Sequence, residues 1–236
     1  MKKIIISKIV PVLLFVFVTG SFFCQEKGGK TDMNKTVTDL IQLPSPEFKS
    51  STSLEEAILT RRSIRDYTKE PLSTKEVSQI LWSAQGITDE ASGLRSAPSA
   101  GATFPLEVYL AVSNVKDLNA GLYKYDPFNN TLKLLAEGDK RFDIANAALK
   151  QGSIEKSAAM VILTAVYERT SVRYGNRTER YVNMEIGHAG QNIYLQAVSL
   201  GLGTVMIGAF NDDALKKVLN LPDNEFPLAI YPLGKI

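Results

Sequence analysis

Arginine side chains gather in one short stretch of this chain, "TRRSIRDY". Three guanidinium groups, those of Arg61, Arg62 and Arg65, and the Ser63 hydroxyl fall within five residues. Planar guanidinium forks give a phosphate paired, charge-assisted hydrogen bonds that lysine does not match. Arginines near the end of a helix also complement the helix dipole. The stretch therefore predicts a phosphate site, with helix capping as the alternative.

A second stretch, "APSAGATFPLEVYL", combines small residues with two prolines. Residues 97–103 carry few large side chains, and Pro98 and Pro105 stiffen them. Backbone N–H groups in such a segment can lie against a flat ligand with no side chain in the way. A third stretch, "LGLGTVMIGAF", places Gly208 in an expected apolar strand, where glycine often marks close approach of a ligand. Together these stretches indicate a site for a planar ligand.

Capping signals and apolar periodicity predict the elements that position these stretches. Ser53 and Glu56 predict a helix before the arginines, with Leu54, Ala57 and Ile58 on one face. A second capping box, Ser73 and Glu76, opens a helix that Gly86 stops. Further along are expected a hairpin turning at 127–130, helices at 141–152, 178–201 and 212–220, and strands at 107–112, 158–167, 203–210 and 226–234. Interleaved helices and strands of this kind predict an α+β fold.

The N-terminal part of the chain predicts export. Basic residues in the first eight positions precede an apolar run over 9–18, which is typical of a secretory signal over residues 1–23; an uncleaved anchor is the alternative. Cys24 follows and resembles the lipidated cysteine of bacterial lipoproteins, although it could be a lone cysteine in a discarded leader. Residues 24–50 read as a polar linker to a domain over 51–236. The expected location is the periplasm or cell envelope.

Composition limits the partners. The whole chain of 236 residues has a formal net charge of +2, which falls to −1 without the three lysines of residues 1–23. No overall bias towards nucleic acid is left, and membrane contact is expected only through a lipid at Cys24. One histidine and one cysteine exclude a Cys/His zinc site within the chain and an intramolecular disulfide.

Four blocks in order, "RRSIRDY", "APSAGATFPLEVYL", "RYVNMEIGHAGQNIYLQAVSLGLGTVMIGAF" and "PLAIYPLGK", resemble the flavin-dependent nitroreductase family. They look most similar to its azoline-dehydrogenase branch, which oxidises heterocycles in modified peptides. The resemblance extends from about Leu54 to the C-terminus. It implies an α+β sandwich with a central, mainly antiparallel sheet flanked by helices. It also implies a homodimer with FMN at the subunit interface.

The same resemblance implies roles for individual residues. The phosphate and ribityl chain of FMN would be held by Arg61, Ser63 and Arg65, with Arg62 beside them and Lys235 meeting the phosphate. The ring would be contacted by Pro98, Ser99, Ala100 and Gly101 from the partner subunit, and by Met206, Ile207 and Gly208. Many members carry a glutamate at the position of Gly208, so the preferred hydride donor stays open. The flavin transfers hydride itself, so no catalytic side chain is required.

The stretch "RYGNRTERY" predicts where substrate approaches. It is rich in arginine and tyrosine for a connecting segment, so substrate is expected beside Tyr174, Arg180 and Tyr181; a solvated helix start is the alternative. Glu185 and His188 form a Glu-x-x-His pair, which is half of a di-iron signature. A second pair cannot exist, because the chain has one histidine. His188 is therefore expected to pack or to form a hydrogen bond within the long helix.

Three functions remain open at this point. The preferred one is an exported FMN oxidoreductase acting on small nitro, quinone or similar acceptors, or oxidising an organic donor, with NAD(P)H as one potential electron donor. The second is azoline oxidation on a modified peptide. The third is a non-catalytic flavin-binding protein of the cell envelope.

Overall fold

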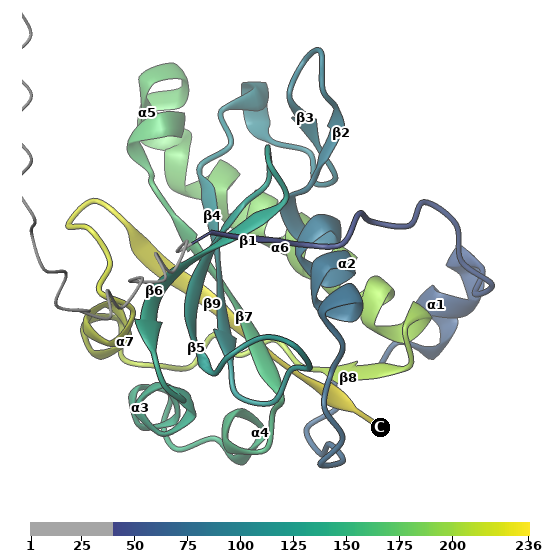
Figure 1. Ribbon diagram of the computed structural model, residues 1–236. Helices are drawn as coiled ribbons and strands as arrows, with labels where there is room; N and C mark the ends of the chain where they lie inside the picture. Colours follow the sequence, from purple (N-terminus) through teal and green to yellow (C-terminus); the bar gives the residue numbers. More distant parts are fainter. Residues whose placement is uncertain (1–39) are drawn as a thin grey trace, which may run out of the picture. The chain divides into compact units, whose positions relative to one another are not determined.

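The computed structural model describes residues 40–236, so the predicted signal sequence, Cys24 and the first part of the linker lie outside the described residues. A seven-stranded sheet in the order β1-β6-β5-β4-β7-β9-β8 forms the centre, and each of its neighbouring strand pairs is antiparallel. Helices cover both faces of the sheet (Figure 1). The predicted α+β sandwich is therefore confirmed.

The strands of the sheet are β1 (Leu40–Gln42), β4 (Leu106–Val112), β5 (Gly121–Asp126), β6 (Thr131–Glu137), β7 (Ala159–Ala165), β8 (Leu202–Thr204) and β9 (Phe226–Lys235). A separate two-stranded ribbon consists of β2 (Ile87–Asp89) and β3 (Leu94–Arg95). The helices are α1 (Leu54–Thr60), α2 (Thr74–Gln85), α3 (Arg141–Ala147), α4 (Gly152–Glu155), α5 (Glu168–Tyr174), α6 (Thr178–Ser199) and α7 (Asp212–Leu219), with short 3-10 turns η1 (Ala100–Ala102) and η2 (Gly175–Arg177).

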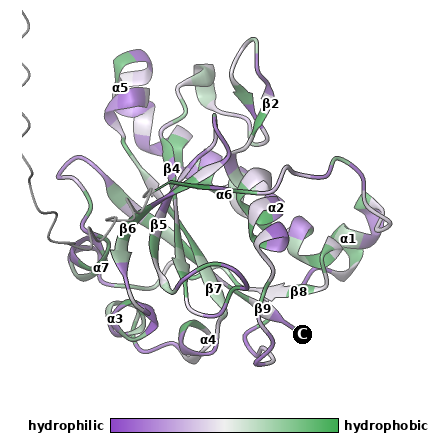
Figure 2. Ribbon diagram, viewed as in Figure 1, coloured by the Kyte–Doolittle hydropathy of each residue, from purple (hydrophilic) through white to green (hydrophobic). Residues whose placement is uncertain are grey.

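Two hydrophobic cores, one on each face of the sheet, explain the continuous apolar run of β7. Val161 and Leu163 pack in the core that α2 and α6 complete, whereas Met160 and Ile162 pack in the core of α3, α4 and α7. All seven residues of β7 are buried, as the run predicted. Figure 2 shows the same arrangement, with hydrophobic residues along the central strands and hydrophilic residues on the outer faces of the helices.

Local capping places the ends of the first two helices. The Ser53 hydroxyl accepts the Glu56 N–H at 3.1 Å, and Ser73 and Glu76 form the full reciprocal box. Helix α1 ends at Thr60, so the arginine stretch lies in extended chain after the helix. Helix α6, the longest, packs against α1, α2, β4 and β8 and reaches both parts of the site described below.

The linker prediction is wrong where the structure can test it. Residues 40–42 form an edge strand against β6, and Leu43 is buried. Side chains of α2 fix the chain that follows, because Ser78 donates to the Pro44 carbonyl at 2.6 Å and Gln79 accepts the Glu47 N–H at 2.7 Å. A strand of three residues that pairs with a strand about 90 residues later in the chain leaves too short a pattern to detect in the sequence.

Two further expectations need correction. The strand expected at 203–210 ends at Thr204, and beyond it Ile207 makes only a single bridge to Ile230, so Gly208 lies in irregular, exposed chain. His188 is exposed on α6 and does not pack in the core.

The helices of residues 40–236 include none with the length and apolar character that a membrane span requires.

Candidate functional site

Two of the predicted binding stretches, the arginine stretch and residues 206–208, meet at the hydroxyl of Tyr194 on α6. Met206 donates its backbone N–H to Tyr194 Oη at 2.8 Å, and Ser63 Oγ lies 3.1 Å from the same oxygen. The Arg61 guanidinium lies 5.1 Å above the centre of the Tyr194 ring. We call Arg61, Ser63, Tyr194 and Met206 the Tyr194 cluster. It contains two of the predicted phosphate ligands and one residue of the predicted ring-binding segment.

Glycines at the sheet edge allow the arginine stretch to lie close to it. Ile64 donates its N–H to the Thr204 carbonyl at 2.8 Å, which joins the stretch to β8. Tyr67 covers Gly234, where a Cβ atom would lie 2.5 Å from the tyrosine Cβ. Burial raises the pKa of Tyr67, so its phenol stays protonated and donates to the Ile64 carbonyl at 2.9 Å. Backbone pairing thus fixes the path of residues 61–67.

The structure divides the arginines between the two interpretations of the stretch. Arg62 donates to the carbonyls of Leu59 and Arg61 at 3.1 and 2.8 Å, and so caps the end of α1. Within residues 40–236, neither Arg61 nor Arg65 donates a side-chain hydrogen bond. The side-chain donors of Arg61 and Arg65 are thus unbonded among the described residues, as a phosphate site requires, whereas Arg62 fits the capping alternative.

Lys235 is already paired in this structure. Its ammonium forms an ion pair with Glu76, the residue that completes the capping box of α2. Partial burial opposes ionisation of Glu76, but hydrogen bonds from Lys235 and Ser73 outweigh it and lower the pKa of Glu76. A phosphate that reached Lys235 would share the three N–H donors of this ammonium with the Glu76 carboxylate.

The small-residue stretch has a strained backbone. Gly101, Ala102 and Phe104 have φ angles of +59°, +54° and +44°, in the left-handed region that side-chain-bearing residues rarely adopt. Each such non-glycine residue costs about 1–3 kcal/mol unless its surroundings hold it, and such residues cluster at functional sites. Phe104 is held from two sides, because its N–H donates to Ser99 Oγ at 2.9 Å and its carbonyl accepts from Arg169 at 3.0 Å.

The predicted substrate residues lie partly against this stretch. A Cβ atom on Gly101 would lie 2.7 Å from Tyr174 Oη, so glycine is what lets the two approach. The rings of Tyr174 and Tyr181 are 4.6 Å apart, which brings both tyrosines to the strained segment. Arg180 is exposed and donates no hydrogen bond among the described residues, so the structure does not join it to them.

A buried carboxyl group adjoins the stretch. Glu185 on α6 is 2% exposed, and its Oε1 has no hydrogen-bond partner within residues 40–236. Burial raises the pKa of Glu185 to about 7, while a hydrogen bond with Ser99 and the charge of Arg95 act in the opposite direction. Arg95 donates to Gln85 Oε1 at 2.9 Å, and its guanidinium lies 4.6 Å from the centre of the Phe104 ring. We call Gln85, Arg95, Ser99 and Glu185 the Glu185 cluster.

Comparison with known proteins shows which family this chain belongs to. The chain matches the nitroreductase family over residues 58–235. It belongs to the nitroreductase family. The family predicted from the four sequence blocks is therefore confirmed, and with it the general class of oxidoreductase-like proteins.

Three similar proteins illustrate the relationship. MJ1384 of Methanocaldococcus jannaschii, provisionally named a nitroreductase, is 44% identical over 195 residues, covering 83% of this chain and 96% of MJ1384. The crystal structure of a provisionally named nitroreductase from Ralstonia eutropha gives a TM-score of 0.75 at 28% identity, covering 85% of this chain and 90% of the other. A chain of the Escherichia coli microcin synthetase McbBCD complex, with truncated pro-MccB17 bound, gives 0.64 at 25% identity, covering 75% and 70%.

Sequence reasoning missed three residues of this nitroreductase site. Tyr194 and Arg95 have no helical or strand spacing to their partners, because Ser63 lies 131 residues from Tyr194 and Gln85 lies ten residues from Arg95. Glu185 did carry a signal. It falls on the buried face of α6 with Val182, Ile186 and Ala189. Because burying a carboxyl group costs free energy, a glutamate in an apolar stripe indicates a specific role. From the sequence alone, Glu185 stands out only as half of a Glu-x-x-His pair.

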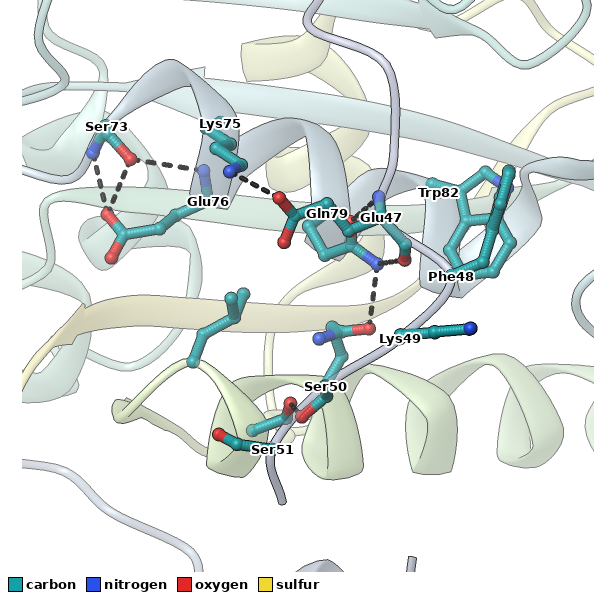
Figure 3. A pocket seen from close by; sticks show the side chains of 13 residues that line it. Glu47, Phe48, Lys49, Ser50, Ser51, Ser73, Lys75, Glu76, Gln79 and Trp82 are labelled. Atoms are coloured by element: carbon teal, nitrogen blue, oxygen red, sulfur yellow. Dashed lines mark hydrogen bonds and ion pairs between the residues drawn. The ribbon is translucent and has the colours of Figure 1, made fainter. Parts of the chain in front are cut away.

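A separate cavity of about 640 Å³ lies between residues 47–51, α2 and the end of α6 (Figure 3). Its polar groups are mostly bonded to one another. Gln79 donates to the Glu47 carbonyl and to Gln196, and Lys75 pairs with Glu47 at 2.6 Å. These bonds fasten residues 47–51 to helices α2 and α6.

The residues of this nitroreductase-family site fit FMN. The donor set at the Tyr194 cluster includes an unbonded guanidinium and a hydroxyl, which suit a phosphate and a ribityl chain. Pro98 and Gly101 are exposed, and a Cβ at Gly208 would meet nothing within 4 Å, so main chain is accessible to a flat ring. Among the described residues, no group of acidic, histidine or cysteine side chains could hold a metal ion.

Proposed function

We propose that this chain is an FMN-dependent oxidoreductase. The observation that carries the proposal is the meeting of Arg61, Ser63 and Met206 on Tyr194, with the Arg61 guanidinium free to bind a phosphate. When bound, FMN supplies the hydride and electron transfer, and the protein supplies binding and orientation. NAD(P)H is one electron donor to test.

Each residue has a physical task in this proposal. Arg61 and Arg65 neutralise the phosphate charge. Tyr194 Oη accepts the Met206 N–H and shares a hydrogen bond with Ser63 Oγ, in which either oxygen can donate; when Tyr194 donates, the Ser63 proton is available to the ligand. Residues 98–101 and 206–208 offer main chain to the ring, and the open space at Gly208 keeps one approach clear.

The apolar face of α1 supports the proposed homodimer. Leu54, Ala57 and Ile58 share the face expected to pack inward, yet only Ala57 is buried. Leu54, Ile58 and Leu59 are 61%, 56% and 73% exposed. Adjacent exposed apolar side chains of this kind mark interaction surfaces. A second copy covering this face, next to the arginine stretch, would place the FMN site at the subunit interface.

The purified full-length chain tests the proposal. We expect a yellow dimer that releases one FMN per chain on denaturation and takes FMN up again after its removal. Arg61→Ala should lower the FMN affinity, whereas the neighbouring Arg62→Ala should not, because Arg62 is engaged with the end of α1. A colourless monomer that takes up no FMN would refute the proposal.

A second candidate, azoline oxidation on a peptide, draws support from the likeness to the microcin synthetase complex with truncated pro-MccB17 bound. Oxidation of an azoline to an azole removes two hydrogens from the peptide and transfers them to the flavin. An azoline peptide losing two hydrogens in the presence of the yellow protein would favour this reading. Rapid NAD(P)H oxidation with nitro compounds or quinones would favour an oxidoreductase that acts on small acceptors. If no pair of electron donor and acceptor were turned over, a non-catalytic flavin carrier would be favoured.

We also propose that the chain is exported and lipid-anchored at Cys24 in the periplasm or envelope. The support is the basic and apolar pattern of residues 1–23. Cys24→Ser should move the protein from the membrane fraction to the soluble exported fraction. Recovery of both forms from the cytoplasm would refute export.

A further inference from the structure

We propose that Arg169 is a positioning residue, which holds residues 98–104 in the conformation that the proposed function places against the flavin ring. The inference rests on that proposed function. It starts from Phe104, whose φ angle is +44° and whose carbonyl accepts a hydrogen bond from Arg169 at 3.0 Å. A side-chain-bearing residue keeps such a backbone only where its surroundings hold it. Arg169 is one of the groups that hold Phe104.

Helix α5 meets the strained segment at three places, of which the Arg169 contact is the first. Thr170 Oγ1 lies 2.9 Å from Thr103 Oγ1. Arg173 donates to the Gly101 carbonyl at 3.2 Å, and this is its one side-chain hydrogen bond within residues 40–236. The three contacts fix the helix and the segment against each other.

Arg169 differs from Arg173 because it is also anchored to the sheet. Its second terminal nitrogen forms an ion pair with Glu107 on β4, whose side chain is 17% exposed. The other oxygen of Glu107 pairs with Lys124 on β5 at 3.0 Å, and Lys124 lies 3.7 Å from the buried carboxylate of Glu225. A continuous set of ion pairs therefore runs from the sheet to the strained segment.

The guanidinium suits this task because it is a planar fork. One terminal nitrogen bonds the Phe104 carbonyl and the other bonds Glu107, so the two partners fix the direction of the group. A lysine ammonium is a flexible point charge and does not hold both partners in one geometry. Two carboxylates and two cations balance in the network, so its effect on a bound flavin is one of geometry.

The test uses the full-length apo-protein, a fluorescence titration with FMN, and the visible circular dichroism of the FMN-saturated proteins. The dichroism reports the asymmetric surroundings of the planar ring. Arg169→Lys keeps the charge and loses the fork, so it should lower the FMN affinity about three- to tenfold and change the dichroism. Arg177→Lys is the matched control and should follow the wild type. Arg177 is an exposed arginine in η2 that makes no side-chain hydrogen bond or ion pair among the described residues.

Glu107→Gln tests whether the carboxylate acts through Arg169. Alone it should change the dichroism and lower the affinity, because the neutral amide holds a guanidinium less firmly. In the Arg169→Lys background it should cause little further loss, because the fork that Glu107 orients is already gone. Fully additive losses would overturn the inference, since each residue would then act separately. Glu107→Gln also keeps Arg169 in place, so its dichroism decides the question if Arg169→Lys does not fold.

Urea unfolding separates positioning from a merely structural role. If Arg169→Lys and Glu107→Gln lowered the free energy of unfolding but kept the dichroism and FMN affinity of the wild type, the inference would be overturned and the proposed function would stand. A wild-type chain that binds no FMN at all would refute both.

Discussion

The two polar clusters carried by α6 differ in what their side chains are bonded to. The Tyr194 cluster lies at the accessible edge of the fold, and its guanidinium makes no hydrogen bond within the described residues. The Glu185 cluster is largely buried, and Ser99 holds a strained backbone, while three atoms of the cluster (Gln85 Nε2, Arg95 Nε and Glu185 Oε1) have no hydrogen-bond partner within residues 40–236. The difference indicates that donors for a ligand are kept free where water can solvate them. Buried polar groups are used where backbone conformation must be imposed, at a cost to stability.

The largest expected effect is the contribution of the buried Glu185 to the free energy of unfolding. The carboxyl of Glu185 has a pKa of about 7 in the folded chain against 4.5 for an ordinary glutamate, so the folded state binds the proton more tightly. Its contribution is fully present below about pH 4.5 and is lost as the pH rises through about 7. At about 1.4 kcal/mol per pKa unit, the total is up to about 3 kcal/mol.

Urea unfolding of the apo-protein across that range measures the effect. The free energy of unfolding of the wild type should fall with rising pH relative to Glu185→Gln, which lacks the titration. If the free energies of unfolding of the two proteins changed equally with pH, Glu185 would not be enclosed, and the contrast between the two clusters would not hold.

On the accessible side, Arg61→Ala should change binding and not folding. Loss of a charge-assisted hydrogen bond to phosphate costs about 1.5–3 kcal/mol, or about ten- to hundredfold in FMN affinity. The free energy of unfolding should stay within about 0.5 kcal/mol, because the half-buried Arg61 side chain donates no hydrogen bond within the described residues. Arg62→Ala serves as the control, with FMN affinity retained. A variant that unfolds easily instead would show that Arg61 is structural.

Gly101→Ala tests the strain in the small-residue segment. Gly101 has a φ angle of +59°, and the new Cβ would lie 2.7 Å from Tyr174 Oη. A side chain in this conformation costs about 1–2 kcal/mol, which thermal unfolding would report. Gly152→Ala is the matched control, since a Cβ there meets nothing within 4 Å and its φ is not positive. Equal midpoints for the two variants would argue against strain.

The smallest effect is expected from Tyr194→Phe. The Met206 N–H and Ser63 lose their partner oxygen, but both lie where water can replace it. We expect a loss of about 1 kcal/mol in stability and a modest decrease in FMN affinity, measured by the same titration. No change in either would mean that Tyr194 does not organise the cluster.

The sequence predicted those parts of the fold and site that depend on near neighbours. The caps at Ser53 and Ser73 act over three residues, and the apolar run of β7 is buried on both faces wherever it lies in the sheet. The edge strand at 40–42 was missed because its strand partner is β6, and its neighbouring chain is held by α2. The strand expected through Gly208 was too long because only Ile207 finds a partner there.

By itself the sequence determined the family, the arginine stretch and the lean segment over 97–103, because residue type and spacing within a few positions record them. Only the tertiary structure decided which arginines are unbonded within residues 40–236, which tyrosine joins Ser63 to Met206, and that Glu185 is enclosed beside Ser99. Ser63 and Tyr194 are 131 residues apart in sequence, and contacts over such distances follow from how α6 packs on the sheet. Local periodicity does not encode them.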